Sequence, residues 1–204
     1  PERRILPLGI PVHPKFNQTL SRADAAAQLD INPNMRTLLL MGGSMGYADH
    51  VKILEKRTSI GIPLQLLVVC GNNKKMQMHV EKFAARYNGN CVIRPYGFVH
   101  NVEVMMSASD CIISKPGGLT VSEALAKNLP MLLADPIPGH EERNVDFLVN
   151  NGMAALITRH FPVDEAVYEL FTNPVRLETV RHTMKAVAHP DATERLADFV
   201  LALK

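Results

Sequence analysis

Residues 114–123 read SKPGGLTVSE, and this stretch lies between two apolar runs, DCII at 110–113 and PMLLAD at 130–135. Short, continuous apolar runs are typical of strands that are buried on both faces of a parallel sheet. Thr120 and Glu123 have the spacing of residues that begin a helix. The stretch therefore predicts a strand, a glycine-rich turn and a helix in succession. The turn serves either tight packing or the docking of an anion.

The same alternation of strand-like and helix-like segments continues along most of the chain. Strands are predicted at 37–41, 65–70, 91–97, 110–114, 131–135 and 154–158, and helices at 51–60, 74–87, 101–109, 120–128 and 140–152. This alternation is the pattern of a parallel sheet with helices on its faces. We therefore predict the α/β class, as a Rossmann-like three-layer sheet of about six strands with flanking helices.

The two ends of the chain depart from this pattern. Prolines at positions 1, 7, 11 and 14 argue against regular structure there, so residues 1–20 are expected to be a linker. A short helix capped by Ser21 should follow it. Apolar residues recur at helical spacing between Pro162 and Lys204, which predicts helices that cover the sheet or an adjoining domain. A helix lying on a membrane is the lesser alternative for this region.

Composition and charge exclude several classes of protein. The 22 basic and 20 acidic residues are interspersed, so no basic stripe for nucleic acid is visible. No apolar run approaches the roughly 20 residues of a transmembrane helix, and no signal-peptide pattern is present. Cys70, Cys91 and Cys111 lack the paired spacing of metal ligands. They are interpreted as reduced core residues of a cytosolic protein without a metal site.

A second glycine-rich turn, MGGSMG at 41–46, follows the first predicted strand. Glycines let a backbone approach a ligand closely, and free amides at a helix start favour a phosphate. The spacing is not GxGxxG, so a dinucleotide is disfavoured. Ligands of open α/β sheets bind beyond the carboxyl ends of the strands. The two glycine-rich turns are therefore expected to face one crevice.

The SKPGG turn offers the groups that a nucleoside diphosphate needs. Amides at 117–120 can hydrogen-bond a diphosphate, and the helix dipole adds positive potential. Glu123 lies one helical turn beyond these amides, where its carboxylate could accept bonds from both hydroxyls of a ribose. The alternative is that Thr120 and Glu123 only form a capping box, which leaves Lys115 and the glycine pair without a role.

Two further stretches offer contacts for a ligand. DPIPGHEERNVDFL at 135–148 brings His140, Glu141 and Asn144 to the start of a helix. Acidic residues there complement the helix dipole, although the same group could also bind the hydroxyls of a sugar. Phe98 and Val99 lie in a loop that could hold a planar base by main-chain bonds or could simply be buried. His79, His160, His182 and His189 are assigned to solvated surfaces.

Together these blocks resemble the C-terminal half of family 28 glycosyltransferases, which have the GT-B fold. The most specific motifs are SKPGGLTVSEA and PGHEERN, and the chain looks most like the diacylglycerol glucosyltransferases and monogalactosyldiacylglycerol synthases of that family. The resemblance implies that residues 21–204 bind UDP-glucose or UDP-galactose, without a metal or other cofactor. The full-length enzyme would transfer the hexose, with inversion, to a lipid such as diacylglycerol, as a cytoplasmic protein in peripheral contact with the membrane.

The resemblance also implies roles for individual residues. The nucleotide would be bound by Gly43, Ser44, Gly46, Phe98, Val99, Ser114, Lys115, Gly117, Gly118, Leu119, Thr120 and Glu123, and the donor sugar by His140, Glu141 and Asn144. Val99 main-chain atoms would read the uracil edge, and Glu123 would take the ribose hydroxyls. His140 departs from the family, where glutamine is common, and this leaves the hexose open.

Catalysis would depend on a part of the enzyme that this chain lacks. In the family, the acceptor and the base that deprotonates it belong largely to an N-terminal domain. We therefore expect no catalytic residue in this chain, which should bind donor without turning it over. Two other functions stay open: a UDP-sugar epimerase of the same architecture, and a non-catalytic nucleotide-binding module.

Overall fold

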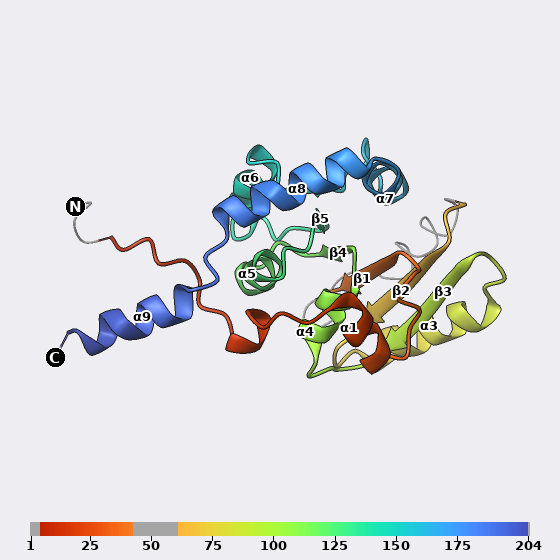
Figure 1. Cartoon of the computed structure of the whole chain (residues 1–204). Coiled ribbons are helices and arrows are strands. Elements are labelled where there is room, and N and C mark those ends of the chain that lie inside the picture. Colours follow the sequence, from red (N-terminus) through yellow and green to blue (C-terminus); the bar gives the residue numbers. More distant parts are fainter. Residues whose placement is uncertain (1–4, 43–60, 204) are drawn as a thin grey trace.

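The computed structural model describes residues 5–42 and 61–203 (Figure 1). Within this part of the chain, six strands form one parallel sheet: β1 (Thr37–Met41), β2 (Leu64–Val69), β3 (Cys91–Tyr96), β4 (Cys111–Ser114), β5 (Met131–Leu133) and β6 (Ala154–Leu156). The predicted α/β class is confirmed, and each predicted strand is present within about two residues of its expected bounds. The helix predicted at 51–60 lies outside the described residues.

The strand order is β3-β2-β1-β4-β5-β6. The chain begins in the middle of the sheet with β1, proceeds outward through β2 and β3, and then returns to place β4 on the other side of β1. Met41 is the register partner of Ser114, so β1 and β4 end side by side. In open α/β sheets, ligands bind beyond the carboxyl ends of the strands at such a reversal of strand order.

Helices cover both faces of the sheet (Figure 1). The helices of the described chain are α1 (Arg22–Gln28), α3 (Lys74–Arg86), α4 (Val102–Ala108), α5 (Gly118–Ala126), α6 (Glu142–Asn150), α7 (Val163–Thr172), α8 (Pro174–Val187) and α9 (Ala192–Leu201), of which α9 does not lie on the sheet. Successive strand residues point to opposite faces. Leu39 accordingly joins a buried cluster with residues of α1, α4, α5 and α6, whereas Leu38 and Leu40 join a second cluster with α3 and α7. The three-layer arrangement is thereby confirmed.

The edge strands differ from the expectation that all strands are buried on both faces. No residue of β3 is fully buried, because β3 has a neighbour on one side only and α3 covers part of it. β6, at the other edge, is likewise only half-buried. Cys91 lies on β3 and is half-buried, while Cys70 and Cys111 are buried as predicted. All three thiols are free.

The segment before α1 packs on the body of the protein. Val12 and Phe16 are buried in the first cluster, and Pro14–Phe16 form one turn of 3₁₀ helix. The Thr193 hydroxyl donates to the carbonyl of Val12 at 2.7 Å, which joins this segment to the start of α9. Beyond that bond α9 extends away from the sheet (Figure 1).

Among the described helices, none is long and apolar enough to cross a membrane.

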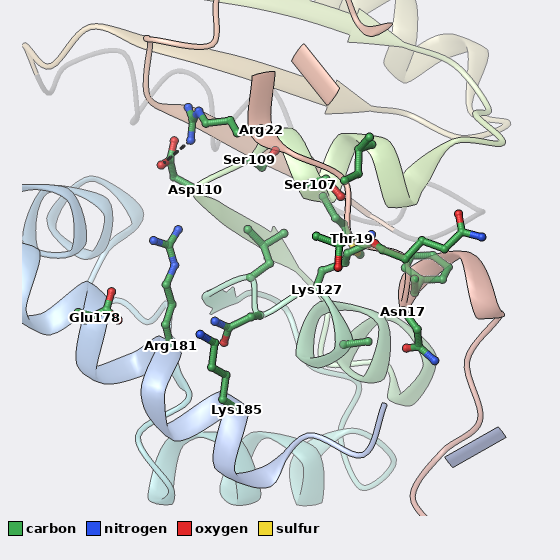
Figure 2. A pocket seen from close by; sticks show the side chains of 17 residues that line it. Asn17, Thr19, Arg22, Ser107, Ser109, Asp110, Lys127, Glu178, Arg181 and Lys185 are labelled. Carbon is green, nitrogen blue, oxygen red and sulfur yellow. Dashed lines mark hydrogen bonds and ion pairs between the residues drawn. The ribbon is translucent and has the colours of Figure 1, made fainter. Parts of the chain in front are cut away.

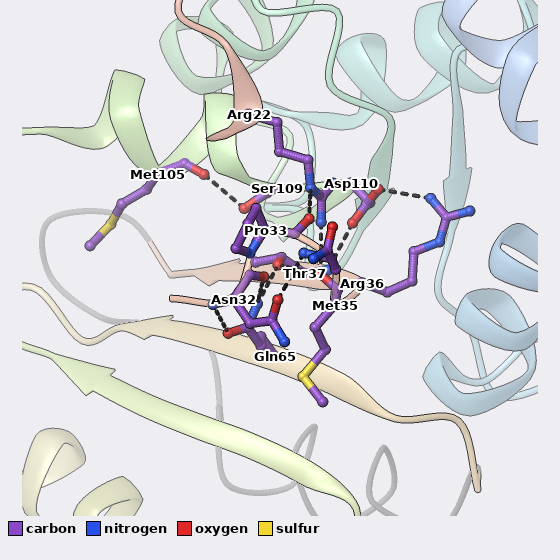
Figure 3. Close-up of polar contacts among 11 residues, drawn as sticks. Arg22, Asn32, Pro33, Met35, Arg36, Thr37, Gln65, Met105, Ser109 and Asp110 are labelled. Atoms are coloured by element: carbon purple, nitrogen blue, oxygen red, sulfur yellow. Dashed lines mark hydrogen bonds and ion pairs between the residues drawn. The ribbon is translucent and has the colours of Figure 1, made fainter. Parts of the chain in front are cut away.

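A buried carboxylate, that of Asp110, joins several elements at the amino end of the sheet (Figure 3). The side chain of Asp110 is only 3% exposed, and its Oδ1 lies 2.7 Å from an Arg22 nitrogen and 2.9 Å from an Arg36 nitrogen. Its Oδ2 accepts a hydrogen bond from the Thr37 amide at 2.8 Å. One carboxylate therefore joins α1, the start of β1 and the start of β4. No local sequence pattern indicates this network.

Candidate functional site

The two glycine-rich turns leave the sheet at the same end. Met41 and Ser114 are register partners, and the chain continues from them into Gly42 and Lys115. Gly42 is buried. The predicted ligands Gly43, Ser44 and Gly46 lie outside the described residues, so the first turn is described only at its start.

The second turn leads directly into α5. Gly117 is the residue that caps this helix, and no side-chain hydrogen bond caps it. The first bond of the helix runs from the Val121 amide to the Gly117 carbonyl at 2.9 Å. The amides of the three preceding helical residues, Gly118, Leu119 and Thr120, consequently have no acceptor inside the helix. They sit at its positive end.

This geometry corrects the predicted start of the helix. The sequence favoured a start at Thr120, with a capping box from Thr120 to Glu123 as one alternative. Because the helix begins at Gly118, Thr120 is its third residue and does not cap it. The structure therefore excludes the capping box, and Glu123 lies in the second turn of the helix.

The glycine pair is not required by the backbone. Gly117 has φ −67° and ψ 136°, which any residue adopts. A Cβ added to Gly117 would come no closer than 3.5 Å to another side chain, namely to Oε1 of Glu141. A Cβ on Gly118 would meet only Cδ1 of Ile10, an exposed side chain, at 3.3 Å. Neither backbone conformation nor packing in the described structure therefore requires glycine at these two positions beside the free amides.

The loop that follows β5 and the first turn of α6 border this turn. The Asn144 side-chain amide donates to the carbonyl of Pro116 at 2.8 Å. Glu141 is 7% exposed, and its Oε2 accepts a hydrogen bond from the Ile137 amide at 2.8 Å, while Oε1 faces Gly117. Two of the three predicted sugar contacts therefore border the start of α5. The third, His140, is exposed on the same loop.

Glu123 is half-buried in a group of charged residues. Burial raises the pKa of its carboxyl from 4.5 to about 7; Lys15 lowers this pKa and Glu103 raises it. The Lys15 ammonium lies 2.9 Å from Oε2 of Glu103 and donates to the carbonyl of His100 at 2.8 Å. Near neutral pH, the Glu123 carboxyl therefore exists in both protonated and ionised forms, as expected for a carboxyl at a functional site.

The loop after β3 places an aromatic ring at the same end of the sheet. Phe98 is 52% exposed, and its ring meets the edge of His100 with centroids 5.0 Å apart. Val99 is half-buried and packs on the first core cluster. Because Lys15 holds the His100 carbonyl, this loop is tied to the segment before α1. An exposed ring beside main-chain groups is suited to a planar base.

Two further predicted residues lie where β4 ends. Ser114 is buried, and its hydroxyl donates to the Lys115 carbonyl at 2.9 Å. Lys115 is half-buried directly after β4. Lys15 and Glu103 were not predicted, because they are linked only by a contact between residues 88 positions apart, a separation that no local pattern reveals. Among the described residues, no group of three or more His, Cys, Asp or Glu side chains could hold a metal ion.

Comparison with known proteins identifies relatives over most of the chain. Residues 37–196 match the model of the glycosyltransferase family 28 C-terminal domain. A processive diacylglycerol β-glucosyltransferase of Bacillus pumilus (strain SAFR-032) is 30% identical over 179 residues, which are 88% of this chain and 46% of the relative. The enzyme of that name from Bacillus subtilis (strain 168) is 29% identical over 95% of this chain and 50% of its own length. The chain thus spans about half the length of these relatives.

Solved structures show the same architecture. The crystal structure of Acinetobacter baumannii MurG superposes with a TM-score of 0.74 at 21% identity, over 92% of this chain and 55% of that protein. WaaG, a glycosyltransferase involved in lipopolysaccharide biosynthesis, superposes with a TM-score of 0.64 at 21% identity, over 98% of this chain and 56% of that protein. At these identities the likeness shows the fold, which is that of the C-terminal half of GT-B glycosyltransferases.

Proposed function

The chain belongs to glycosyltransferase family 28, and on that premise we propose that it is the donor-binding domain of an enzyme that transfers a hexose from a UDP-sugar to a lipid acceptor. Diacylglycerol is the acceptor that the names of the similar Bacillus enzymes suggest. The donor would be UDP-glucose or UDP-galactose, bound without a metal or other cofactor. The acceptor and the catalytic base would belong to a region outside this chain.

The observation that carries this proposal is the bare start of α5. Gly117 and Gly118 are not required by backbone conformation, and Gly117 has room for a side chain. Glycine at these two positions is explained if a ligand approaches the amides of residues 118–120, because a side chain would stand in its way. A diphosphate fits this position, because it brings two anionic groups to the positive end of a helix.

Neighbouring residues complete the proposed donor site. Glu123, in the second turn of α5, would accept hydrogen bonds from the ribose hydroxyls when it is ionised. Phe98 and the main chain of Val99 would hold the uracil, and Lys115 would lie near the diphosphate. His140 and Glu141 on the loop after β5, with Asn144 in the first turn of α6, would contact the hexose. These roles agree with the way the three loops converge at the carboxyl end of the sheet.

The chemical contribution of this chain would concern the leaving group. In a transfer with inversion, the acceptor oxygen attacks the anomeric carbon as the bond to the diphosphate breaks. Negative charge then develops on the diphosphate, and fixed amides at the start of α5, with Lys115, would stabilise it. Membrane contact of the full-length enzyme would be peripheral and would bring this site to a lipid acceptor.

A donor titration tests the proposal. Calorimetry with UDP, UDP-glucose, UDP-galactose and UDP-N-acetylglucosamine should detect binding of UDP and tighter binding of one UDP-sugar. Glu123→Ala should weaken UDP binding by about 1 to 3 kcal/mol, because it leaves the ribose hydroxyls unpaired. The matched control is Glu165→Ala, which removes an exposed carboxylate from α7. Absence of binding to all four compounds, or equal effects of the two substitutions, would contradict the proposal.

A further inference from the structure

A cavity lies at the opposite end of the sheet from the proposed donor site. It has a volume of about 730 Å³ and borders the residues that precede β4 and β5, including Asp110 and Leu129 (Figure 2). Its walls come from the segment before α1 and from α1, α4, α5 and α8. Pockets for small molecules usually measure about 300 to 1,000 Å³. The space is therefore large enough for a ligand.

The lining of this cavity has an excess of positive charge. Arg22, Lys127, Arg181 and Lys185 line it, against the two carboxylates of Asp110 and Glu178. Asp110 is already engaged by Arg22 and Arg36. Arg181 and Lys185 are four residues apart on α8 and rise from that helix into the cavity (Figure 2). Within the described part of the chain, neither of them forms an ion pair.

Two adjacent residues at the end of α5 add polar groups to the same cavity. Lys127 donates to the carbonyl of Gln18 at 2.8 Å, and burial lowers the pKa of its ammonium, an effect that Glu103 opposes. A bound anion would offset this cost of burial. The Oδ1 atom of Asn128 is buried and has no hydrogen-bond partner among the described residues. A buried acceptor of this kind calls for a donor such as a hydroxyl group.

We propose that this cavity binds a phosphate ester that carries free hydroxyl groups, at a site separate from the donor site. Arg181, Lys185 and Lys127 would hold the phosphate, since ammonium and guanidinium groups form charge-assisted hydrogen bonds with it. A hydroxyl of the ester would donate to Asn128 Oδ1. The ester could be a soluble phosphorylated polyol or the headgroup of a glycerophospholipid, which share this chemistry.

Nuclear magnetic resonance locates the binding. The chain labelled with nitrogen-15 is titrated with inorganic phosphate and with glycerol 3-phosphate at low ionic strength. Saturable shifts should appear at the amides of Thr19 and Asn128, which line the cavity. Shifts confined to Leu119 and Thr120 would place the anion at the start of α5 and overturn the proposal. The absence of any saturable shift at millimolar concentrations would overturn it as well.

Two pairs of substitutions separate a specific site from general attraction. Arg181→Gln with Lys185→Gln should weaken binding of glycerol 3-phosphate by about 10-fold or more, equal to 1.4 kcal/mol. The control, Lys82→Gln with Arg86→Gln, removes the same two charges at the same spacing from the exposed face of α3. It should leave the affinity unchanged. Equal losses of affinity in both double variants would show that only the net charge of the protein matters, and would reject the site.

A third variant tests the hydroxyl contact. Asn128 has φ 50°, a left-handed conformation that glycine also adopts, so Asn128→Gly removes the amide without straining the backbone. This variant should bind inorganic phosphate normally and should lose the preference for glycerol 3-phosphate. An unchanged preference would contradict the assigned contact.

Vesicle flotation identifies the source of the phosphate. The chain is mixed with phosphatidylcholine vesicles that either contain or lack phosphatidylglycerol, whose headgroup is a glycerol phosphate. Retention that requires phosphatidylglycerol and is lost with Arg181→Gln and Lys185→Gln assigns the ester to a lipid. Saturable binding of glycerol 3-phosphate without such retention assigns it to a soluble metabolite. Either result supports a phosphate-ester site.

Discussion

The side-chain nitrogen of Asn144 lies 2.8 Å from the carbonyl oxygen of Pro116. Through this bond the first turn of α6 holds the turn that follows β4. The two segments are 28 residues apart in the sequence, yet one would contact the hexose of a donor and the other its diphosphate. The bond therefore couples the two halves of the proposed donor site.

Removal of this bond should affect the sugar more than the nucleotide. We expect Asn144→Ala to lower the affinity for the preferred UDP-sugar by about 5-fold to 10-fold, the equivalent of one hydrogen bond of about 1 kcal/mol. The affinity for UDP should change less, because the amides of α5 remain in place. Calorimetry with both ligands measures the difference.

Asn151 provides a matched control for this substitution. Its side-chain amide donates to the Phe147 carbonyl at 2.7 Å, at the far end of the same helix, α6. Asn151→Ala removes a similar bond and should leave both affinities unchanged. A loss of UDP binding in Asn144→Ala equal to the loss of UDP-sugar binding would reject the coupling.

Substitution of Gly117 should separate stability from binding. The backbone of Gly117 suits alanine, and the added methyl group makes only an ordinary contact with Glu141. Gly117→Ala should therefore lower the free energy of unfolding by no more than about 1 kcal/mol, because alanine disturbs no packing here but is a poorer N-cap than glycine. It should weaken UDP binding by about 10-fold or more, since the methyl group occupies the approach to the amides. Thermal unfolding and calorimetry measure the two effects.

Gly152 is expected to show the reverse behaviour. It has φ 68°, in the left-handed region that a side chain disfavours, and it follows α6 at a distance from the proposed site. Gly152→Ala should cost about 1 to 2 kcal/mol of stability and leave UDP binding unchanged. If Gly117→Ala destabilised the protein and left UDP binding unchanged, Gly117 would be needed only for the fold.

Local sequence patterns were sufficient to predict the sheet. Each strand of the described chain is a run of mainly apolar residues, and this pattern depends only on neighbours in the sequence. The order of the strands and the pairing of Met41 with Ser114 depend on contacts over 73 residues and required the structure. The start of α5 was misplaced because Thr120 and Glu123 match a capping box, whereas Gly117 caps the helix through its backbone.

The candidate site was only partly predictable for the same reason. The glycine pair and the PGHEERN motif carry a local signal. Lys15 does not, because it lies in a proline-rich segment and reaches Glu103 and His100 only in the folded chain. The Asp110 network is similar, since Arg22, Arg36 and Asp110 are far apart in sequence and meet at the amino end of the sheet.

Loss of the Asp110 carboxylate should destabilise the fold without a direct effect on the proposed site. Asp110→Ala leaves Arg22 and the Thr37 amide without their buried acceptor. The two arginines are 33% and 45% exposed and remain in contact with water, so the main cost is the buried Thr37 amide left without an acceptor, about 1 to 3 kcal/mol. We expect a loss of this size in urea unfolding. The control, Glu169→Ala, removes the partner of Arg176 on the surface and should cost no more than about 1 kcal/mol. Equal losses would show that Asp110 is not essential to the sheet.

The raised pKa of Glu123 predicts that stability declines as pH rises. The folded protein holds this proton up to about pH 7, whereas an unfolded chain releases it near 4.5. Between these values the folded state binds more protons, so the free energy of unfolding falls with increasing pH. Glu123→Gln, which cannot titrate, should reduce this slope. Urea unfolding at several pH values measures it, and an identical slope in both proteins would contradict the assignment.

Ligand binding should show the opposite dependence on pH, and Lys15 should set its midpoint. If ionised Glu123 accepts bonds from the ribose, the affinity for uridine should rise as pH increases through about 7. Uridine is the suitable probe because it carries no phosphate that titrates in this range. Lys15 lowers the pKa of Glu123, so Lys15→Met should move the midpoint to higher pH. The control Lys75→Met, on the exposed side of α3, should not move it. A uridine affinity that does not depend on pH would contradict the contact between Glu123 and the ribose. A midpoint that Lys15→Met leaves unchanged would show that Lys15 does not set the pKa of Glu123.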